Sequence, residues 1–96
     1  MAAVRFSERA LADLERLTEF LAGSDPDAAA DTAKIVVEAF DVLHRHPEIG
    51  RPGEDAFREL IISRGRTGYV ALYGYDEADD TVVVHAIRHQ REAGYA

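Results

Sequence analysis

Positive charge gathers at one end of a predicted strand pair in an otherwise acidic chain. Residues 69–75 and 81–87 are dense in β-branched and aromatic side chains and flank a short acidic connector. That connector cannot hold a crossover helix, so the pattern predicts an antiparallel hairpin. Segments just outside both strands then meet at one end of the sheet. The basic residues expected there, which we call the basic strand end, are Arg64, Arg66, Arg88, His89 and Arg91. Arginine forks bind carboxylates and phosphates in bidentate fashion, so this end is the candidate contact for a target.

Alternation within the two strands predicts a sheet that is apolar on both faces. With Tyr75 opposite Thr81 and Tyr69 opposite Ile87, one face carries Tyr69, Ala71, Tyr73, Tyr75, Val83, His85 and Ile87. The other carries Val70, Leu72, Gly74, Val82, Val84, Ala86 and Arg88. One helical hairpin can cover only one face, so the second predicts a protein partner. Alternatively, the loop at 47–56 or the C-terminal tail folds over it. Polar tips on Tyr and His favour leaving the first face in water.

Composition limits the functions that this chain can have. Its 96 residues suit a single domain, 1–96, and the net charge of −7 with a pI near 4.9 argues against nonspecific nucleic-acid binding. The sequence has no cysteine, which excludes disulfides and thiolate chemistry. We recognise neither a signal peptide nor an apolar run of membrane-spanning length. We therefore expect a cytoplasmic protein with no membrane association, no cofactor and no metal.

Periodicity and end signals predict the elements that position the basic strand end. Leucines at helical spacing follow Ser7, a good N-cap, and Gly23 suits the residue after the helix. Asp25-Pro26 then begins a second helix. The predicted elements are an edge strand at 4–6, helices at 8–22 and about 26–46, and strands at 57–63, 69–75 and 81–87. The fold class is α+β in the order β-α-α-β-β-β, with a helical hairpin at about 8–46 packed on a mainly antiparallel sheet at about 57–89.

Other polar clusters have simpler explanations. His44 and His46 flank a helix end, where cations already favour the negative pole of the dipole, and no carboxylate or Cys spacing completes a metal site. The aspartates of the hairpin connector are expected to form a solvated turn. Tyr95 is the one position where a general acid or base could lie, and a packed or frayed C-terminus explains it equally well.

The order of elements and several short motifs resemble the RelE/ParE superfamily of bacterial toxins. The resemblance rests on the Pro-Glu-Ile-Gly-Arg-Pro loop at 47–52, the strand at 57–63, the Gly68-Tyr69 pair, the Leu72-Tyr73 step and the closing Ile87-Arg88-His89-Gln90-Arg91-Glu92. It covers nearly the whole chain, and its specificity comes from the order of the motifs. The resemblance implies the toxin component of a type II toxin–antitoxin module, as found in plasmid stabilisation, and a cognate antitoxin as partner in a hetero-oligomer.

The family divides by target, and this chain departs from the RNA-cutting branch. Relatives that cleave ribosome-bound mRNA stabilise the phosphate transition state with Lys and Arg. Such relatives carry a basic residue directly after the Gly-Tyr pair, where this chain has Val70, and lysines on the preceding strand, where it has Ile61 and Ser63. If the chain were a ribonuclease, its catalytic residues would be Arg88, Arg91 and Tyr95.

The remaining branch resembles ParE toxins, which inhibit DNA gyrase by binding and need no catalytic residue. The resemblance implies gyrase as the target, with an RNA-cutting toxin or a non-toxic antitoxin-binding module as alternatives. It also implies that the second face stays open and that an antitoxin segment fills it. The antitoxin-binding candidates are Ile61, Val70, Leu72, Val82, Val84 and Ala86.

Overall fold

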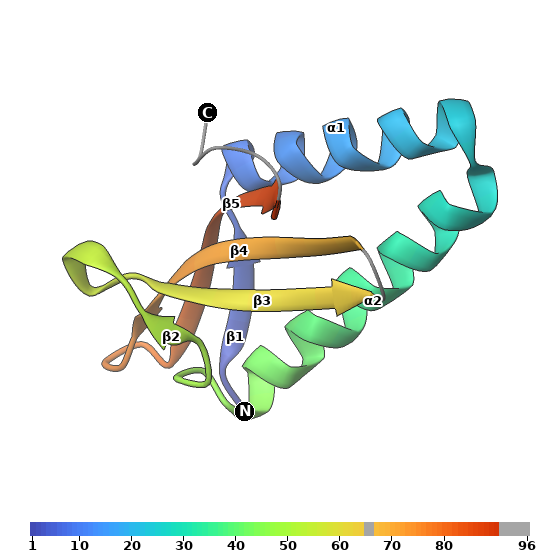
Figure 1. Cartoon of the computed structure of the whole chain (residues 1–96). Coiled ribbons are helices and arrows are strands. Elements are labelled where there is room, and N and C mark those ends of the chain that lie inside the picture. Colours follow the sequence, from blue (N-terminus) through green and yellow to red (C-terminus); the bar gives the residue numbers. More distant parts are fainter. Residues whose placement is uncertain (65–66, 91–96) are drawn as a thin grey trace.

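A helical hairpin packs on a mixed five-stranded sheet in the computed structural model, which describes residues 1–64 and 67–90 (Figure 1). The strand order is β1-β5-β4-β3-β2, with β1 parallel to β5 and every other neighbouring pair antiparallel. This confirms the predicted α+β class. The elements are β1 (Ala3–Phe6), α1 (Glu8–Ser24), α2 (Pro26–Arg45), β2 (Arg51–Pro52), a 3-10 turn (Glu54–Ala56), β3 (Arg58–Arg64), β4 (Thr67–Asp76) and β5 (Thr81–His89).

Local signals explain where the helices begin and end. The Ser7 hydroxyl accepts a hydrogen bond from the Ala10 amide at 3.0 Å, which confirms the predicted N-cap. The predicted stop at Gly23 is wrong, because α1 continues through it to Ser24. The break falls at Asp25, since the residue before a proline is disfavoured in the helical region. From this turn the two helices splay apart as a V (Figure 1). Within the described residues, no helix is long and apolar enough to cross a membrane.

The sheet contains one strand that the sequence did not predict. β1 lies at the edge, as expected, and pairs in parallel with β5 from Ala3 opposite Thr81 to Phe6 opposite Val84. At the opposite edge, the two residues of β2 pair with the start of β3, within a segment predicted to be irregular. So short a strand, half of it proline, shows no alternation that sequence analysis could detect.

The register of the β4–β5 hairpin differs from the predicted one. Its turn has four residues, because the Asp76 carboxylate accepts the amides of Ala78 and Asp79 at 3.0 and 3.3 Å and Asp76 itself joins β4. Thr81 therefore lies opposite Asp76. Further along, the pairing skips His85, so that β5 has a β-bulge.

This register decides which side chains the helices cover. A shift of one residue turns every following side chain of β5 to the other face, and the bulge turns the strand back. Val82 and Val84 therefore share the helix-covered face with Tyr73, and Ile87 joins Ala71 there. Phe6 and Phe40 meet edge to face, with ring centroids 4.6 Å apart. The buried core comprises Ala2, Ala10, Leu17, Val36, Phe40, Leu43, Ile62, Tyr69, Ala71, Tyr73, Val82, Val84 and Ile87.

Asp13 stabilises the stretch of β5 that β1 does not reach. Its carboxylate accepts the Ile87 amide at 3.0 Å, and its ion pairs with Arg9 and Arg16 are long, at 4.0 and 3.8 Å. We expect Asp13→Ala to lower the free energy of unfolding by roughly 1–3 kcal/mol, because it leaves a partly buried amide without its acceptor. Urea unfolding measures the change, with the exposed Glu38→Ala as control. Equal stabilities for the two variants would contradict this role.

Candidate functional site

The basic strand end exists as a backbone arrangement. Arg64 ends β3 opposite Thr67, and Arg88 lies opposite Val70 beside the start of β4. Strand ends from β3, β4 and β5 therefore meet at one end of the sheet, as the sequence predicted. Arg66 and Arg91, together with Tyr95, lie outside the described residues.

Two members of this group point to opposite faces of the sheet. His89 lies on the helix-covered face, where its ring meets Tyr69 edge to face at 5.4 Å. Arg88, opposite Val70, lies on the other face. Its Nη1 donates to the carbonyls of His89 and Gln90 at 3.2 and 3.3 Å. The convergent cluster that the sequence suggested is therefore split across the sheet. Arg88 alone of this pair can contact a ligand on the open face.

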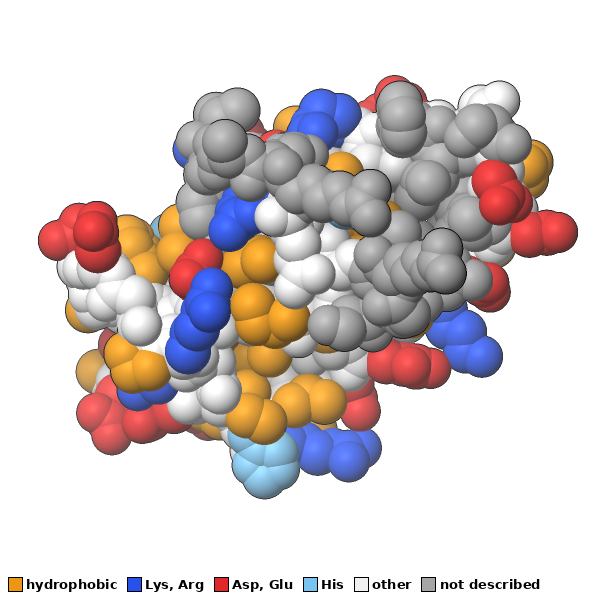
Figure 2. Space-filling model, viewed as in Figure 1, with side chains coloured by type: hydrophobic (Ala, Val, Ile, Leu, Met, Phe, Trp, Pro, Cys, Tyr) orange, Lys and Arg blue, Asp and Glu red, His pale blue; other side chains and the backbone are white. Residues whose placement is uncertain are grey.

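The face away from the helices, which we call the open face, is apolar along the middle of the sheet. Ile61 is 40% exposed, Leu72 is half-buried, and their neighbours Val70 and Ala86 are buried. Figure 2 shows hydrophobic side chains gathered over this part of the sheet. The placement of Val82 and Val84 on this face is wrong, because both are 0% exposed in the core beneath the helices. The register shift and bulge of β5 explain the error.

Few cations lie on the open face among the described residues. Arg51 is paired with Glu59, with its Nη2 at 3.1 Å and its Nε at 3.2 Å from the same carboxylate oxygen. Arg88 and the exposed Arg5 are the other arginines placed on this face, and Arg5 lies on β1 opposite Val83, in a hollow that Asp76 and Asp79 also line. The single lysine of the sequence, Lys34, lies on α2. His85 packs its ring edge to face on Phe57 at 4.9 Å, so it lies on the open face and not on the face of Tyr69 and Ala71 where alternation had placed it.

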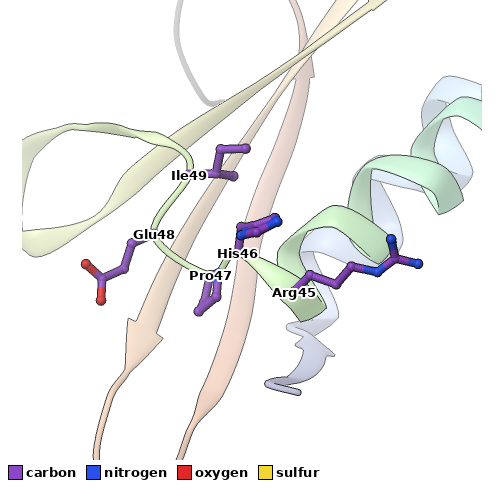
Figure 3. A pocket seen from close by; sticks show the side chains of 5 residues that line it. All are labelled: Arg45, His46, Pro47, Glu48 and Ile49. Carbon is purple, nitrogen blue, oxygen red and sulfur yellow. The ribbon is translucent and has the colours of Figure 1, made fainter.

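The loop that joins α2 to β2 is held by hydrogen bonds from two side chains, and neither residue was predicted from the sequence to have this role. The Tyr73 hydroxyl accepts the Gly50 amide at 2.8 Å. Arg58 donates through Nη1 to the carbonyls of Glu48 and Gly50, at 3.1 and 2.8 Å. The loop thereby presents Ile49, 54% exposed, beside a surface pocket of about 480 Å³ (Figure 3). Both supports come from distant strands, so no local motif points to them.

The histidines and acids singled out in the sequence form no metal site in the part of the chain that the structure describes. No group of three or more His, Asp or Glu side chains there could hold a metal ion. His44 instead ties the N-terminus to α2, since its Nδ1 lies 2.6 Å from the Ala2 carbonyl oxygen and its own carbonyl accepts the Ala2 amide at 2.9 Å. His46 is exposed at the pocket beside Ile49 (Figure 3).

Two tyrosines make the fold sensitive to alkaline pH. Burial raises the pKa of Tyr73, and the Asp80 carboxylate, 2.7 Å from the Tyr75 hydroxyl, raises the pKa of Tyr75 from 10.0 to about 12. The folded chain holds both protons more tightly than the unfolded chain. Their contribution to stability is therefore complete below about pH 10 and is lost as the pH rises towards 12.

We expect Tyr75→Phe to flatten this dependence. Because the variant has no Tyr75 proton to lose, its stability relative to the wild type should improve steadily between pH 9 and pH 11. Urea midpoints across that range, about a unit either side of the ordinary tyrosine pKa, measure the difference. Parallel pH profiles for the two proteins would show that the Tyr75–Asp80 hydrogen bond does not act in this way.

Known proteins share both the sequence pattern and the fold. The family profile described as the ParE toxin of the type II toxin–antitoxin system parDE matches residues 4–94. Toxin RelE3 of Caulobacter vibrioides is 34% identical over 92 residues, which cover 96% of this chain and 98% of that protein. A chromosomal ParDE toxin–antitoxin system from P. aeruginosa contains a chain with a TM-score of 0.75 at 20% identity, covering 93% of this chain and 96% of that one. The RelBE2 toxin–antitoxin complex from Mycobacterium tuberculosis gives a TM-score of 0.62 at 27% identity, covering 95% and 93%.

Proposed function

This chain belongs to the ParE toxin family of type II toxin–antitoxin systems, and on that premise we propose that it inhibits DNA gyrase by binding and is neutralised by a cognate antitoxin. The observation that carries the choice of target is the scarcity of cations on the open face. Cleaving a phosphodiester requires positive charge where the transition state gains negative charge. At the positions where RNA-cutting relatives place basic residues, this chain has the buried Val70 and the aliphatic Ile61.

The remaining cations of the open face do not assemble a phosphate site. Arg51 is engaged with Glu59, and Arg88 donates to backbone carbonyls at the end of its own strand. Arg5 lies apart from both on the edge strand β1, beside the acidic Asp76 and Asp79. Inhibition by binding needs no such site, so the open face suits it better than catalysis. In this proposal the basic strand end contacts gyrase through its arginines, Arg64, Arg66, Arg88 and Arg91, while His89 packs on Tyr69 on the helix-covered face.

The antitoxin in the proposal occupies the apolar strip of the open face. Both solved relatives named above come from toxin–antitoxin systems, which supports a partner of this kind. Of the predicted antitoxin-binding residues, Ile61 and Leu72 are accessible on this strip, whereas Val70 and Ala86 lie on the same face but are only 2% and 1% exposed. The toxin and antitoxin would form a hetero-oligomer. An extended or helical antitoxin segment could bury this strip through alternate side chains.

A ribosome-dependent mRNA endonuclease is the second candidate. It is favoured by the 34% identity to a protein named RelE3, and its residues would be Arg88, Arg91 and Tyr95. One experiment separates the two functions: the chain is expressed alone under tight induction, while a DNA-damage reporter and the integrity of translated messages are followed. We expect filamentation, DNA damage and intact messages. Cleavage of translated messages without DNA damage would overturn gyrase as the target. Unimpaired growth with intact protein would leave an antitoxin-binding module.

The basic strand end is tested by its arginines. We expect the double variant Arg88→Ala and Arg91→Ala to lose growth inhibition and to lose inhibition of purified gyrase. The reason is that, in the proposal, both arginines contact gyrase through their guanidinium charge. Arg45→Ala is the matched control, since Arg45 lies at the end of α2 and pairs with Asp41 at 3.2 Å. Full toxicity of the double variant would exclude this end as the target contact.

A further inference from the structure

A second hollow on the open face combines an apolar floor with an acidic rim. Its volume is about 370 Å³, and its lining residues are Gly53, Glu54, Asp55, Phe57, Glu59 and Leu72. We call it the acidic pocket. Phe57 and Leu72 supply the apolar surface. The Phe57 ring is fixed on one side by the edge of His85 and lies over Gly74, where even a Cβ would approach the ring to 3.5 Å.

The rim carries more negative than positive charge. Three carboxylates line it and Arg51 offsets one of them through its ion pair with Glu59, so the local balance is 1 − 3 = −2. Glu54 and Asp55 are exposed on the turn between β2 and β3, where Figure 2 shows acidic side chains beside the apolar sheet. The turn is closed by two hydrogen bonds, from the Gly53 amide to the Phe57 carbonyl at 2.8 Å and from the Phe57 amide to the Glu54 carbonyl at 3.0 Å.

The acidic pocket is continuous with the apolar strip of the open face. Leu72 belongs to both, and it lies opposite Glu59 while Val70 lies opposite Ile61, two residues further along the same face. A segment that covers the strip therefore passes the mouth of the pocket. The net charge of −7 favours a basic partner over a second copy of this chain, because two copies would bring like charges together.

We propose that the acidic pocket takes one arginine or lysine side chain from the antitoxin segment that covers the open face. This rests on the antitoxin partner of the proposed function. The aliphatic stem packs on Leu72 and Phe57, the cationic head lies over the Phe57 ring, and the rim carboxylates bind it. Such a pocket adds apolar contact to the complex. Its carboxylates also repel an acidic side chain, so antitoxins that place an acidic residue at the pocket are rejected.

The test removes the charge of the rim without changing its shape. Glu54→Gln with Asp55→Asn keeps the side-chain volumes, and Asn tolerates the left-handed backbone of Asp55, whose φ is 54°. We expect the dissociation constant of the complex with the cognate antitoxin to rise about tenfold, and its salt dependence to weaken. Glu77→Gln with Asp79→Asn, on the β4–β5 turn and outside the lining of the acidic pocket, is the matched control and should bind as the wild type does. Unchanged affinity and salt dependence in the rim variant would overturn the proposal.

A small probe tests the pocket independently of the antitoxin. Nα-acetyl-L-arginine amide, titrated into the isotope-labelled chain, should shift the amide resonances of Gly53–Phe57 and Leu72 in the wild type and not in the rim variant. If the wild-type chain binds no antitoxin, the partner in the proposed function fails, while shifts confined to these residues still support a cation pocket. If the probe shifts no resonance there, the pocket proposal fails whatever the antitoxin does.

Discussion

Tyr73→Ala is expected to lower the free energy of unfolding by roughly 3–5 kcal/mol. Tyr73 is 0% exposed and heads the fully buried side chains by volume, so its removal leaves a cavity between the sheet and the helices. The variant also leaves the Gly50 amide without the hydroxyl that accepts it at 2.8 Å. A domain of this size has a total stability on the order of 5–15 kcal/mol, so the variant should lose much of its cooperative transition in urea.

Two companion variants separate the ring of Tyr73 from its hydroxyl. Tyr73→Phe keeps the ring and should cost only roughly 1–3 kcal/mol, the effect of one unsatisfied buried amide. Gly50→Ala should disrupt the same hydrogen bond by changing its donor residue. A Cβ at position 50 would lie 2.7 Å from Cε1 and Oη of Tyr73 and 2.9 Å from the Glu59 carbonyl oxygen, which is too close. If Tyr73→Phe proved as costly as Tyr73→Ala, the cavity argument would be wrong.

Ile61→Asp is expected to weaken antitoxin binding about 100-fold or more, with little change in stability. Ile61 is 40% exposed on the open face, so a carboxylate there remains hydrated in the free toxin. In the complex it would be buried against an apolar segment without a partner charge. Calorimetric titration with the antitoxin measures the affinity, and thermal unfolding of the free toxin measures the stability.

Two further substitutions make this result interpretable. Ile49→Asp introduces the same charge at a residue that is 54% exposed on the loop after α2, outside the open face, and should leave binding unchanged. Val84→Asp places it at a 0% exposed core position and should prevent folding, because a carboxylate buried without a partner is very costly. Wild-type affinity in Ile61→Asp would show that the antitoxin lies elsewhere.

Sequence patterns alone predicted both helices, four of the five strands and the family. The leucine spacing after Ser7 indicated α1, Asp25-Pro26 marked the start of α2, and alternating β-branched runs indicated β3, β4 and β5. These signals are local, because capping and helical or strand periodicity depend on residues within a few positions of one another. The same linear order placed Arg64 and Arg88 at one end of the sheet, and the motifs along the chain indicated the toxin family.

Only the tertiary structure decided which side chains the open face presents. Alternation specifies a period of two but not which half of the residues faces the helices. The Asp76 turn and the bulge at His85 set that choice, and they buried Val82 and Val84 while leaving Ile61 and Leu72 accessible.

The long-range contacts of Tyr73 and the acidic pocket were likewise decided in three dimensions. Tyr73 meets Gly50 across 23 residues of sequence, and the pocket unites the turn after β2 with Leu72 on β4. A short sequence window contains only one partner of each contact. The local sequence therefore determines which elements form, whereas strand register and packing determine which residues meet.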